Sequence, residues 1–198
     1  DTRTWHRLRY LDEKFGGYNV SDFTYQAVQK FVDERLNTVS SGMVMKDVAY
    51  LKAIINKARR EGLTQFVPNF PRVKPSDPRT RWLTEDEESR LLPAAAPHLR
   101  LLIAFAIDTG GRLSELLGLD WRNVELNSGW VTFVQTKNGR DRTIKLCDRA
   151  IQTLMQLEPK SSGIVFTYAG KPIKSVKTAF GTACKKASVV NFRFHDLR

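Results

Sequence analysis

The most informative segment of the sequence is Thr109-Gly110-Gly111-Arg112-Leu113-Ser114-Glu115-Leu116. Its two glycines permit a tight turn between helices, so Arg112 stands where a new helix begins. Glu115 follows about one helical turn later, close enough to orient the arginine. The amides of a helix start and a guanidinium fork together suit a phosphate group. From these residues alone, an ion pair that only stabilises the helix start is an equally good interpretation.

Around this stretch the sequence predicts a mixed domain of helices and a few short strands. Thr84-Glu85-Asp86-Glu87 has the pattern of a capping box, and residues 99–107 are apolar nearly all round, as in a buried helix. Residues 130–134 and 143–146 predict two strands joined around Asn138-Gly139, a strong hairpin signal. The other predicted elements are a helix capped by Asp148 with Ile151, Leu154 and Met155 inward, a strand at 164–166, a helix from Ser175 and a last turn near Phe194.

The first third of the chain predicts helices only. Apolar residues recur at helical spacing from Trp5 to Phe15, and Gly16-Gly17 then supplies a stop. Ser21 is the expected cap of a second helix, and Ser40 or Ser41 opens a third. The third helix carries one apolar stripe that is interpreted as core, formed by Val44, Val48, Leu51, Ile55 and Ala58.

A basic, proline-rich segment separates the two parts of the chain. Its prolines interrupt any regular element, which predicts a stiff, semi-extended linker. Its prolines and basic residues are Pro68, Pro71, Pro75, Pro78, Arg72, Lys74, Arg79 and Arg81. The segment is consistent with a clamp around a polyanion, and equally with an ordinary solvated connection.

The charge of the chain is strongly positive throughout. Lys and Arg number 32 against 21 Asp and Glu, a net charge of +11 with a pI near 9.9. Residues 1–80 carry 14 basic and 9 acidic side chains, and residues 81–198 carry 18 and 12. A field that is positive over both halves favours a polyanionic partner, with a merely solvated basic surface as the alternative.

Several classes of protein are disfavoured by composition. Cys147 and Cys184 are too few and too isolated for a disulfide framework or a zinc site. The first residues lack the apolar core of a signal peptide, and the longest apolar run, 101–107, is too short to span a bilayer. We therefore expect a reducing, cytoplasmic location without a membrane segment.

Two further groups of residues carry chemistry. The predicted hairpin tip, Thr136-Lys137-Asn138-Gly139-Arg140-Asp141-Arg142, can bring an ammonium group to a leaving oxygen. In His195-Asp196-Leu197-Arg198, the spacing puts His195 and Arg198 on one helical face, where they can hold a phosphate and move a proton. Taken singly, a solvated hairpin and a structural histidine are the more ordinary interpretations.

Taken together and in this order along the chain, these motifs resemble those of the tyrosine recombinase or phage integrase family. Residues 109–116 look like the first arginine box of the family. Thr136-Lys137, followed by a turn and Arg142-Thr143-Ile144, looks like its lysine hairpin, and Phe194-His195-Asp196-Leu197-Arg198 looks like the start of its second box. The resemblance covers essentially the whole chain.

The resemblance implies a mainly α fold with a small β-hairpin or sheet. It divides the chain into a helical core-binding domain at 1–65, a basic linker at 66–82, and a mixed α+β catalytic domain of the tyrosine recombinase type at 83–198. It further implies site-specific DNA recombination or integration, by strand cleavage and rejoining through a 3′-phosphotyrosyl intermediate. That chemistry requires neither a metal nor another cofactor.

The resemblance also assigns roles to single residues. Arg112 and Arg198 match two arginines that bind phosphate oxygens, and Glu115 matches an acid that supports the site. Lys137 matches the proposed general acid for the leaving 5′ oxygen, and His195 a histidine that assists proton transfer. The expected partner is double-stranded DNA, bound by a homo-tetramer on paired sites. Further candidates for DNA contacts are Arg72, Lys74, Arg79, Arg81, Arg140 and Arg142.

The sequence departs from the family pattern at the nucleophile. In the family, a His or Trp and then the reactive tyrosine follow the second arginine, whereas this sequence ends at Arg198. Its tyrosines all precede the second box and are Tyr10, Tyr18, Tyr25, Tyr50 and Tyr168. We therefore expect a chain that is cut off before its nucleophile and cannot cleave DNA by itself.

Three other functions remain as alternatives. A non-catalytic DNA-binding regulator accounts for the helical first third but leaves the four candidate catalytic residues unexplained. A type IB topoisomerase shares the catalytic logic, although a separate core-binding domain favours a recombinase. A metal-dependent nuclease needs converging acidic side chains, and no such motif stands out.

Overall fold

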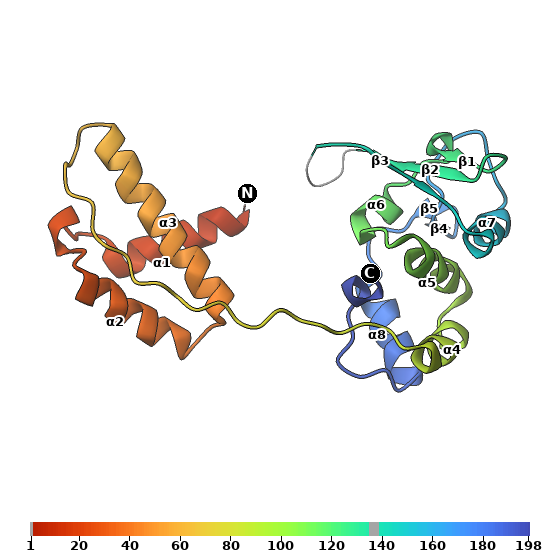
Figure 1. Ribbon diagram of the computed structural model, residues 1–198, viewed down its shortest axis with the longest axis horizontal. Helices are drawn as coiled ribbons and strands as arrows, with labels where there is room; N and C mark the ends of the chain where they lie inside the picture. Colours follow the sequence, from red (N-terminus) through yellow and green to blue (C-terminus); the bar gives the residue numbers. More distant parts are fainter. Residues whose placement is uncertain (1, 135–138) are drawn as a thin grey trace. The chain divides into compact units, whose positions relative to one another are not determined.

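The chain forms two compact units, Asp1–Arg79 and Thr80–Arg198. Figure 1 shows them in a computed structural model, which describes residues 2–134 and 139–198. None of the helices in these ranges is both long and apolar enough to cross a membrane. The first unit is helical and the second mixes helices with short strands, which confirms the predicted fold class.

The first unit consists of α1 (Thr2–Phe15), α2 (Tyr25–Leu36) and α3 (Ser41–Arg60). The expected stripe of α3 is core, because Val44, Leu51 and Ile55 are buried against α1 and α2. The expected cap at Ser21 is wrong. Residues Val20–Asp22 form a 3-10 turn, and the Thr24 hydroxyl oxygen accepts from the Ala27 amide at 3.2 Å, so α2 begins later than predicted.

A buried carboxylate joins the three helices of the first unit. Asp47 on α3 is 1% exposed and accepts from Nε of Arg7 at 2.6 Å and from Nε of Arg35 at 3.1 Å. The guanidinium of Arg35 lies 3.9 Å from the ring centroid of Tyr10, and that of Arg7 lies 5.3 Å from the ring centroid of Tyr50. The spacing of these residues along the sequence does not predict this cluster.

The segment after α3 is irregular, as its prolines predict. It is not simply a solvated connection, since Val73 is buried in the core of the first unit together with Leu11 and Val44. The first unit therefore extends to Arg79, and most of the segment predicted as a linker at 66–82 belongs to it.

The helices of the second unit surround a single core. They are α4 (Glu85–Ala94), α5 (Pro97–Thr109), α6 (Leu113–Leu117), α7 (Asp148–Met155) and α8 (Lys177–Lys186), with 3-10 turns at Trp121–Asn123 and Phe194–Leu197. Helix α5 lies at the centre, where Leu102, Ile103 and Phe105 have no exposed surface, and it packs against α4, α6 and α7. The capping box at Thr84 is confirmed, because Thr84 and Glu87 exchange hydrogen bonds of 3.2 Å.

Two small antiparallel sheets complete the second unit. The first has the order β1 (Val124–Glu125), β2 (Trp130–Phe133), β3 (Arg142–Lys145), so the predicted strand pair gains a short third strand. The second pairs β4 (Thr167–Tyr168) with β5 (Lys171–Pro172). In the larger sheet Phe133 lies directly opposite Arg142, at the point where the connection between β2 and β3 begins.

Three local predictions in this unit are wrong. Asp148 is the first residue of α7 rather than its cap, which is Cys147, and Met155 is 58% exposed instead of inward. Residues 164–166 supply only an isolated bridge from Ile164 to Asp120, while the strand follows at β4. Helix α8 begins at Lys177 with Val176 as its cap, two residues after the predicted Ser175.

Candidate active site

The turn before Arg112 needs both of its glycines. Gly110 ends α5 with a φ of +56°, in the left-handed region that disfavours side chains, and its amide donates to the Ala106 carbonyl at 2.9 Å. A Cβ on Gly111 would lie 2.6 Å from Cδ2 of Leu116, closer than packed atoms allow. Arg112 is the N-cap residue of α6, and the tight turn fixes the position of its backbone.

Glu115 binds Arg112 from behind, as predicted. Its Oε2 accepts from the Arg112 amide at 3.0 Å, and its Oε1 accepts from Nη1 of Arg112 at 2.6 Å. The Glu115 side chain is only 4% exposed, whereas that of Arg112 is 30% exposed. The carboxylate therefore holds one edge of the guanidinium and leaves the rest of Arg112 partly open to solvent.

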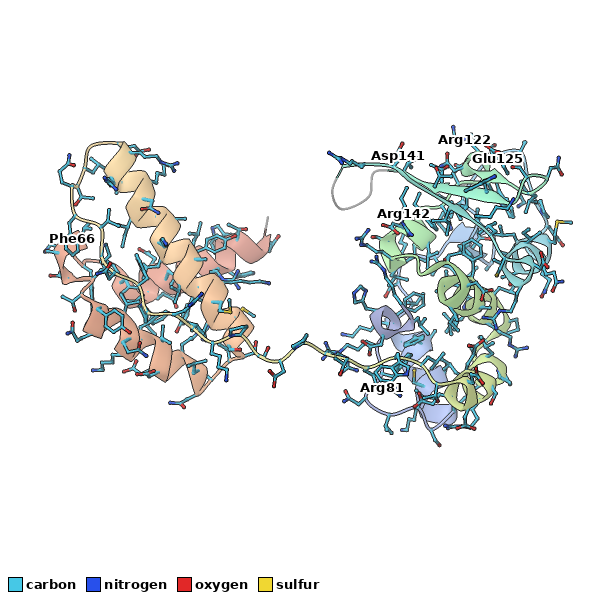
Figure 2. All side chains as sticks on the ribbon, in the orientation of Figure 1. Phe66, Arg81, Arg122, Glu125, Asp141 and Arg142 are labelled. Carbon is cyan, nitrogen blue, oxygen red and sulfur yellow. The ribbon has the colours of Figure 1, made fainter. Side chains whose placement is uncertain are left out.

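A second arginine shares the same carboxylate. Nη2 of Arg142, on β3, donates to Oε2 of Glu115 at 2.9 Å; Figure 2 labels Arg142. The Arg142 guanidinium also lies 4.9 Å from the ring centroid of Phe133, the residue opposite it in the sheet. Its Nε is buried and has no hydrogen-bond partner within the described residues.

These contacts fix the charge of Glu115. Burial disfavours the carboxylate form, but the hydrogen bonds from the Arg112 amide, the Arg112 guanidinium and the Arg142 guanidinium more than offset it, and the pKa of Glu115 lies below its ordinary value. Glu115 is therefore an anion at neutral pH. With two arginines on one carboxylate, the cluster carries one net positive charge.

The 3-10 turn at Phe194–Leu197 brings Arg198 close to the turn that precedes Arg112. Leu197 is buried in the core of the second unit, and the turn packs against α5. The amide of Arg193 donates to Oδ2 of Asp196 at 2.8 Å, which caps the turn. A Cβ built on Gly110 would lie 3.8 Å from Cγ of Arg198, so this side chain reaches the turn that carries Arg112.

The remaining predicted residues are distributed differently. His195 is exposed, in the same turn as Arg198. Lys137 lies outside the described residues. Arg140 is among the described residues and is exposed. The candidates Arg72, Lys74 and Arg79 belong to the first unit and are exposed.

Arg81, another predicted DNA contact, makes several contacts within the second unit. Its guanidinium binds both carboxylate oxygens of Glu87 and the Trp82 carbonyl, and lies 4.8 Å from the ring centroid of Phe192. The Arg81 hydrogen bond is the main cause that holds the pKa of Glu87 below its ordinary value. Arg81 thus fixes the start of the second unit to α4.

Sequence reasoning missed the pairing of Arg142 with Glu115. Arg142 was predicted as one of six DNA contacts, as a basic residue of the hairpin tip. Only the register of β2 and β3 places it opposite Phe133 and toward α6. Across residues 2–134 and 139–198 there is no cluster of three or more His, Cys, Asp or Glu that could hold a metal ion.

The family model for the phage integrase family matches residues 81–198, more than half of the chain. The chain belongs to the phage integrase family. The match spans nearly the whole second unit, including the Arg112 turn, the β2–β3 pair and the turn with His195 and Arg198.

Curated relatives agree with this membership of the phage integrase family. The chain is 27% identical to the integrase of Salmonella phage P22 over 168 residues, which cover 76% of the chain and 43% of that protein. It is 29% identical to a shufflon-specific DNA recombinase of Escherichia coli, over 91% of the chain and 50% of that protein. The chain thus spans about half the length of these relatives.

Solved structures of integrases share the fold. A lambda integrase dimer bound to a COC′ core site has a TM-score of 0.77 at 20% identity, covering 100% of this chain and 80% of that one. The integrase of transposon Tn1549 with transposon right end DNA has a TM-score of 0.80 at 15% identity, covering 98% and 76%. The fold is therefore that of the tyrosine recombinase type.

Proposed function

We propose that this chain is the DNA-binding and catalytic core of a site-specific DNA recombinase. The observation that carries the proposal is the meeting of Arg112, Glu115 and Arg198 at one turn of a phage integrase family domain. Two arginines at one place suit the two nonbridging oxygens of a phosphodiester. The double-stranded DNA partner is supported by the net charge of +11 and by relatives solved with DNA.

The proposed chemistry is transesterification. A tyrosine hydroxyl attacks the phosphorus and forms a 3′-phosphotyrosyl bond, while the bond from phosphorus to the 5′ oxygen breaks. Lys137 donates a proton to that leaving oxygen, and His195 assists proton transfer. The phosphoester linkage is conserved, so rejoining to another strand requires no ATP. None of the five tyrosines of this chain is assigned as the nucleophile.

Arg112 and Arg198 would stabilise the charge that builds on the nonbridging oxygens. Glu115 does not touch DNA in this proposal, because its carboxylate is almost fully buried. It holds Arg112 in one orientation, which lowers the entropy lost when the phosphate binds.

The first unit would act as the core-binding domain, and the assembly would be a homo-tetramer on paired DNA sites. A solved lambda integrase tetramer bound to a Holliday junction, with a TM-score of 0.76, supports this assembly. The segment at 66–82 would then connect the two DNA-binding units, although its buried Val73 ties part of it to the first.

Strand transfer tests the proposed function. The complete product of the gene is incubated with two DNA molecules that carry its target site, one of them labelled. A recombinase moves the labelled strand to the second molecule. Relaxation of supercoils without transfer would instead support a type IB topoisomerase, and binding without either reaction a regulator.

A further inference from the structure

Arg142 has a contact that a DNA-binding hairpin residue does not need. Its Nη2 donates to the buried Oε2 of Glu115, the same oxygen that accepts from the Arg112 amide. Its guanidinium lies over Phe133, which is 1% exposed and belongs to the core. Arg142 is thus held on one side by the core and on the other by the acid that orients Arg112.

The charges at this cluster explain why a second arginine is useful. With Arg112 alone, the Glu115 anion would cancel the positive charge that has to act on a phosphate. With Arg142 also bound, one positive charge remains for the exposed side of the cluster. Arg142 and the Arg112 amide both donate to Oε2, so the Arg112 guanidinium is bound through Oε1 alone.

We propose that Arg142 is a positioning residue, which acts through Glu115 to keep Arg112 oriented and positively charged toward DNA. The inference rests on the proposed function and deepens it. It replaces the expectation that Arg142 is a DNA contact. Through the Glu115 carboxylate, Arg142 at the base of the hairpin is linked to the turn that carries Arg112.

The test measures single-turnover cleavage of a nicked DNA substrate by the complete product of the gene. Arg142→Gln is expected to cleave roughly 10- to 100-fold more slowly, since a small misplacement of a catalytic group can cost about 10²-fold. Arg142→Lys is expected to cleave faster than Arg142→Gln but more slowly than wild type, because an ammonium can supply the hydrogen bond to Glu115 but loses the planar contact with Phe133. Arg122→Gln is the matched control, as Arg122 forms a surface pair with Asp120 in the same unit (Figure 2).

A double-mutant cycle separates this role from simple loss of structure. In a Glu115→Gln background, Arg142→Gln is expected to slow cleavage by less than about 3-fold, because its route of action is already broken. If the factors by which the two substitutions slow cleavage multiply in the double variant, the proposal is overturned. Thermal unfolding of each variant is recorded in parallel, and slow cleavage by Arg142→Gln that follows only from an unfolded second unit would also overturn it.

DNA affinity and the leaving group supply two further readouts. Arg142→Gln is expected to leave the Kd and its salt dependence unchanged, whereas a weaker Kd with a salt slope reduced by about one would make Arg142 a phosphate contact. A substrate with sulfur at the bridging 5′ position is expected to rescue Lys137→Ala but not Arg142→Gln. Equal cleavage by wild type and Arg142→Gln would overturn the role of Arg142 alone, and an inactive wild type would overturn the proposed function with it.

Discussion

Asp47 in the first unit and Glu115 in the second are both buried carboxylates clamped by two arginines. The side chain of Asp47 is 2% exposed and that of Glu115 is 4% exposed. The arginines differ: Arg7 and Arg35 are 16% and 20% exposed, whereas Arg112 and Arg142 are 30% and 32% exposed. The two clusters therefore share a motif but not an environment.

The surroundings of the guanidinium groups separate the two clusters. Arg7 and Arg35 each lie over a tyrosine ring and join three helices through Asp47. In the second cluster Arg142 also lies over a ring, that of Phe133, whereas Arg112 stands at a glycine turn that Arg198 also reaches. A clamped carboxylate is thus not by itself a sign of function. We infer that the Asp47 cluster serves stability and the Glu115 cluster serves the reaction.

Asp47→Ala is expected to give the largest change in stability. It leaves two half-buried arginines without their acid, which costs about 3–5 kcal/mol for a buried ion pair. Hydrogen exchange resolved by peptide should show lost protection in α1, α2 and α3, with the second unit unchanged. Asp33→Ala, which removes an exposed acid of α2 that accepts a hydrogen bond from Gln29, is the control. Protection equal to wild type in the Asp47 variant would contradict a structural role.

Glu115→Gln is expected to act on the reaction instead. The neutral amide keeps the shape but loses the charge that holds both arginines, so single-turnover cleavage should fall roughly 10- to 100-fold. DNA affinity should change by less than about 3-fold, since Glu115 is buried and does not touch DNA, and Arg112, which it orients, makes one phosphate contact among many. Cleavage at the wild-type rate would mean that Arg112 needs no support from this acid.

The effect of Glu115→Gln on the free energy of unfolding is expected to depend on pH. The pKa of Glu115 in the folded protein lies below its ordinary 4.5. Its contribution to stability is therefore present above that value and is lost as the pH falls through the lowered pKa. The difference in free energy of unfolding between wild type and Glu115→Gln should be about 2 kcal/mol near neutral pH and shrink below pH 4.5. A difference that stays constant on acidification would contradict the assigned charge.

Arg122→Gln is expected to give the smallest effect. Arg122 pairs with Asp120 and holds the pKa of Asp120 at about 2, but the arginine side chain is 72% exposed. Exposed ion pairs contribute little, so stability, DNA affinity and cleavage should stay close to wild type. A large loss would show that exposure is the wrong criterion for separating the two clusters.

Much of the fold follows from local sequence signals, because their causes are local. The capping box at Thr84, the apolar run of α5 and the glycines before Arg112 each act within a few residues, and each is confirmed. The cap of α2 was predicted three residues too early, since Ser21 and Thr24 are both good cap residues and residue type alone does not choose between them.

The parts that depend on distant contacts could not be predicted. Asp47 and its arginines come from three helices, and nothing in their spacing announces that they meet. The partner of Arg142 can be predicted only once the register of β2 and β3 is known. The pairing of Arg112 with Glu115, by contrast, was predicted, because it lies within one helical turn.

The most direct test of the account is the covalent intermediate. The complete product of the gene is mixed with a nicked DNA substrate in EDTA, denatured in detergent and examined for protein-linked DNA. We expect a covalent band with wild type and none with Arg112→Ala, which should still bind the DNA non-covalently, since the arginine acts mainly on charge in the transition state. A band of wild-type intensity from Arg112→Ala, or a band that appears only with added divalent cation, would contradict the assignment of this turn as the catalytic phosphate site.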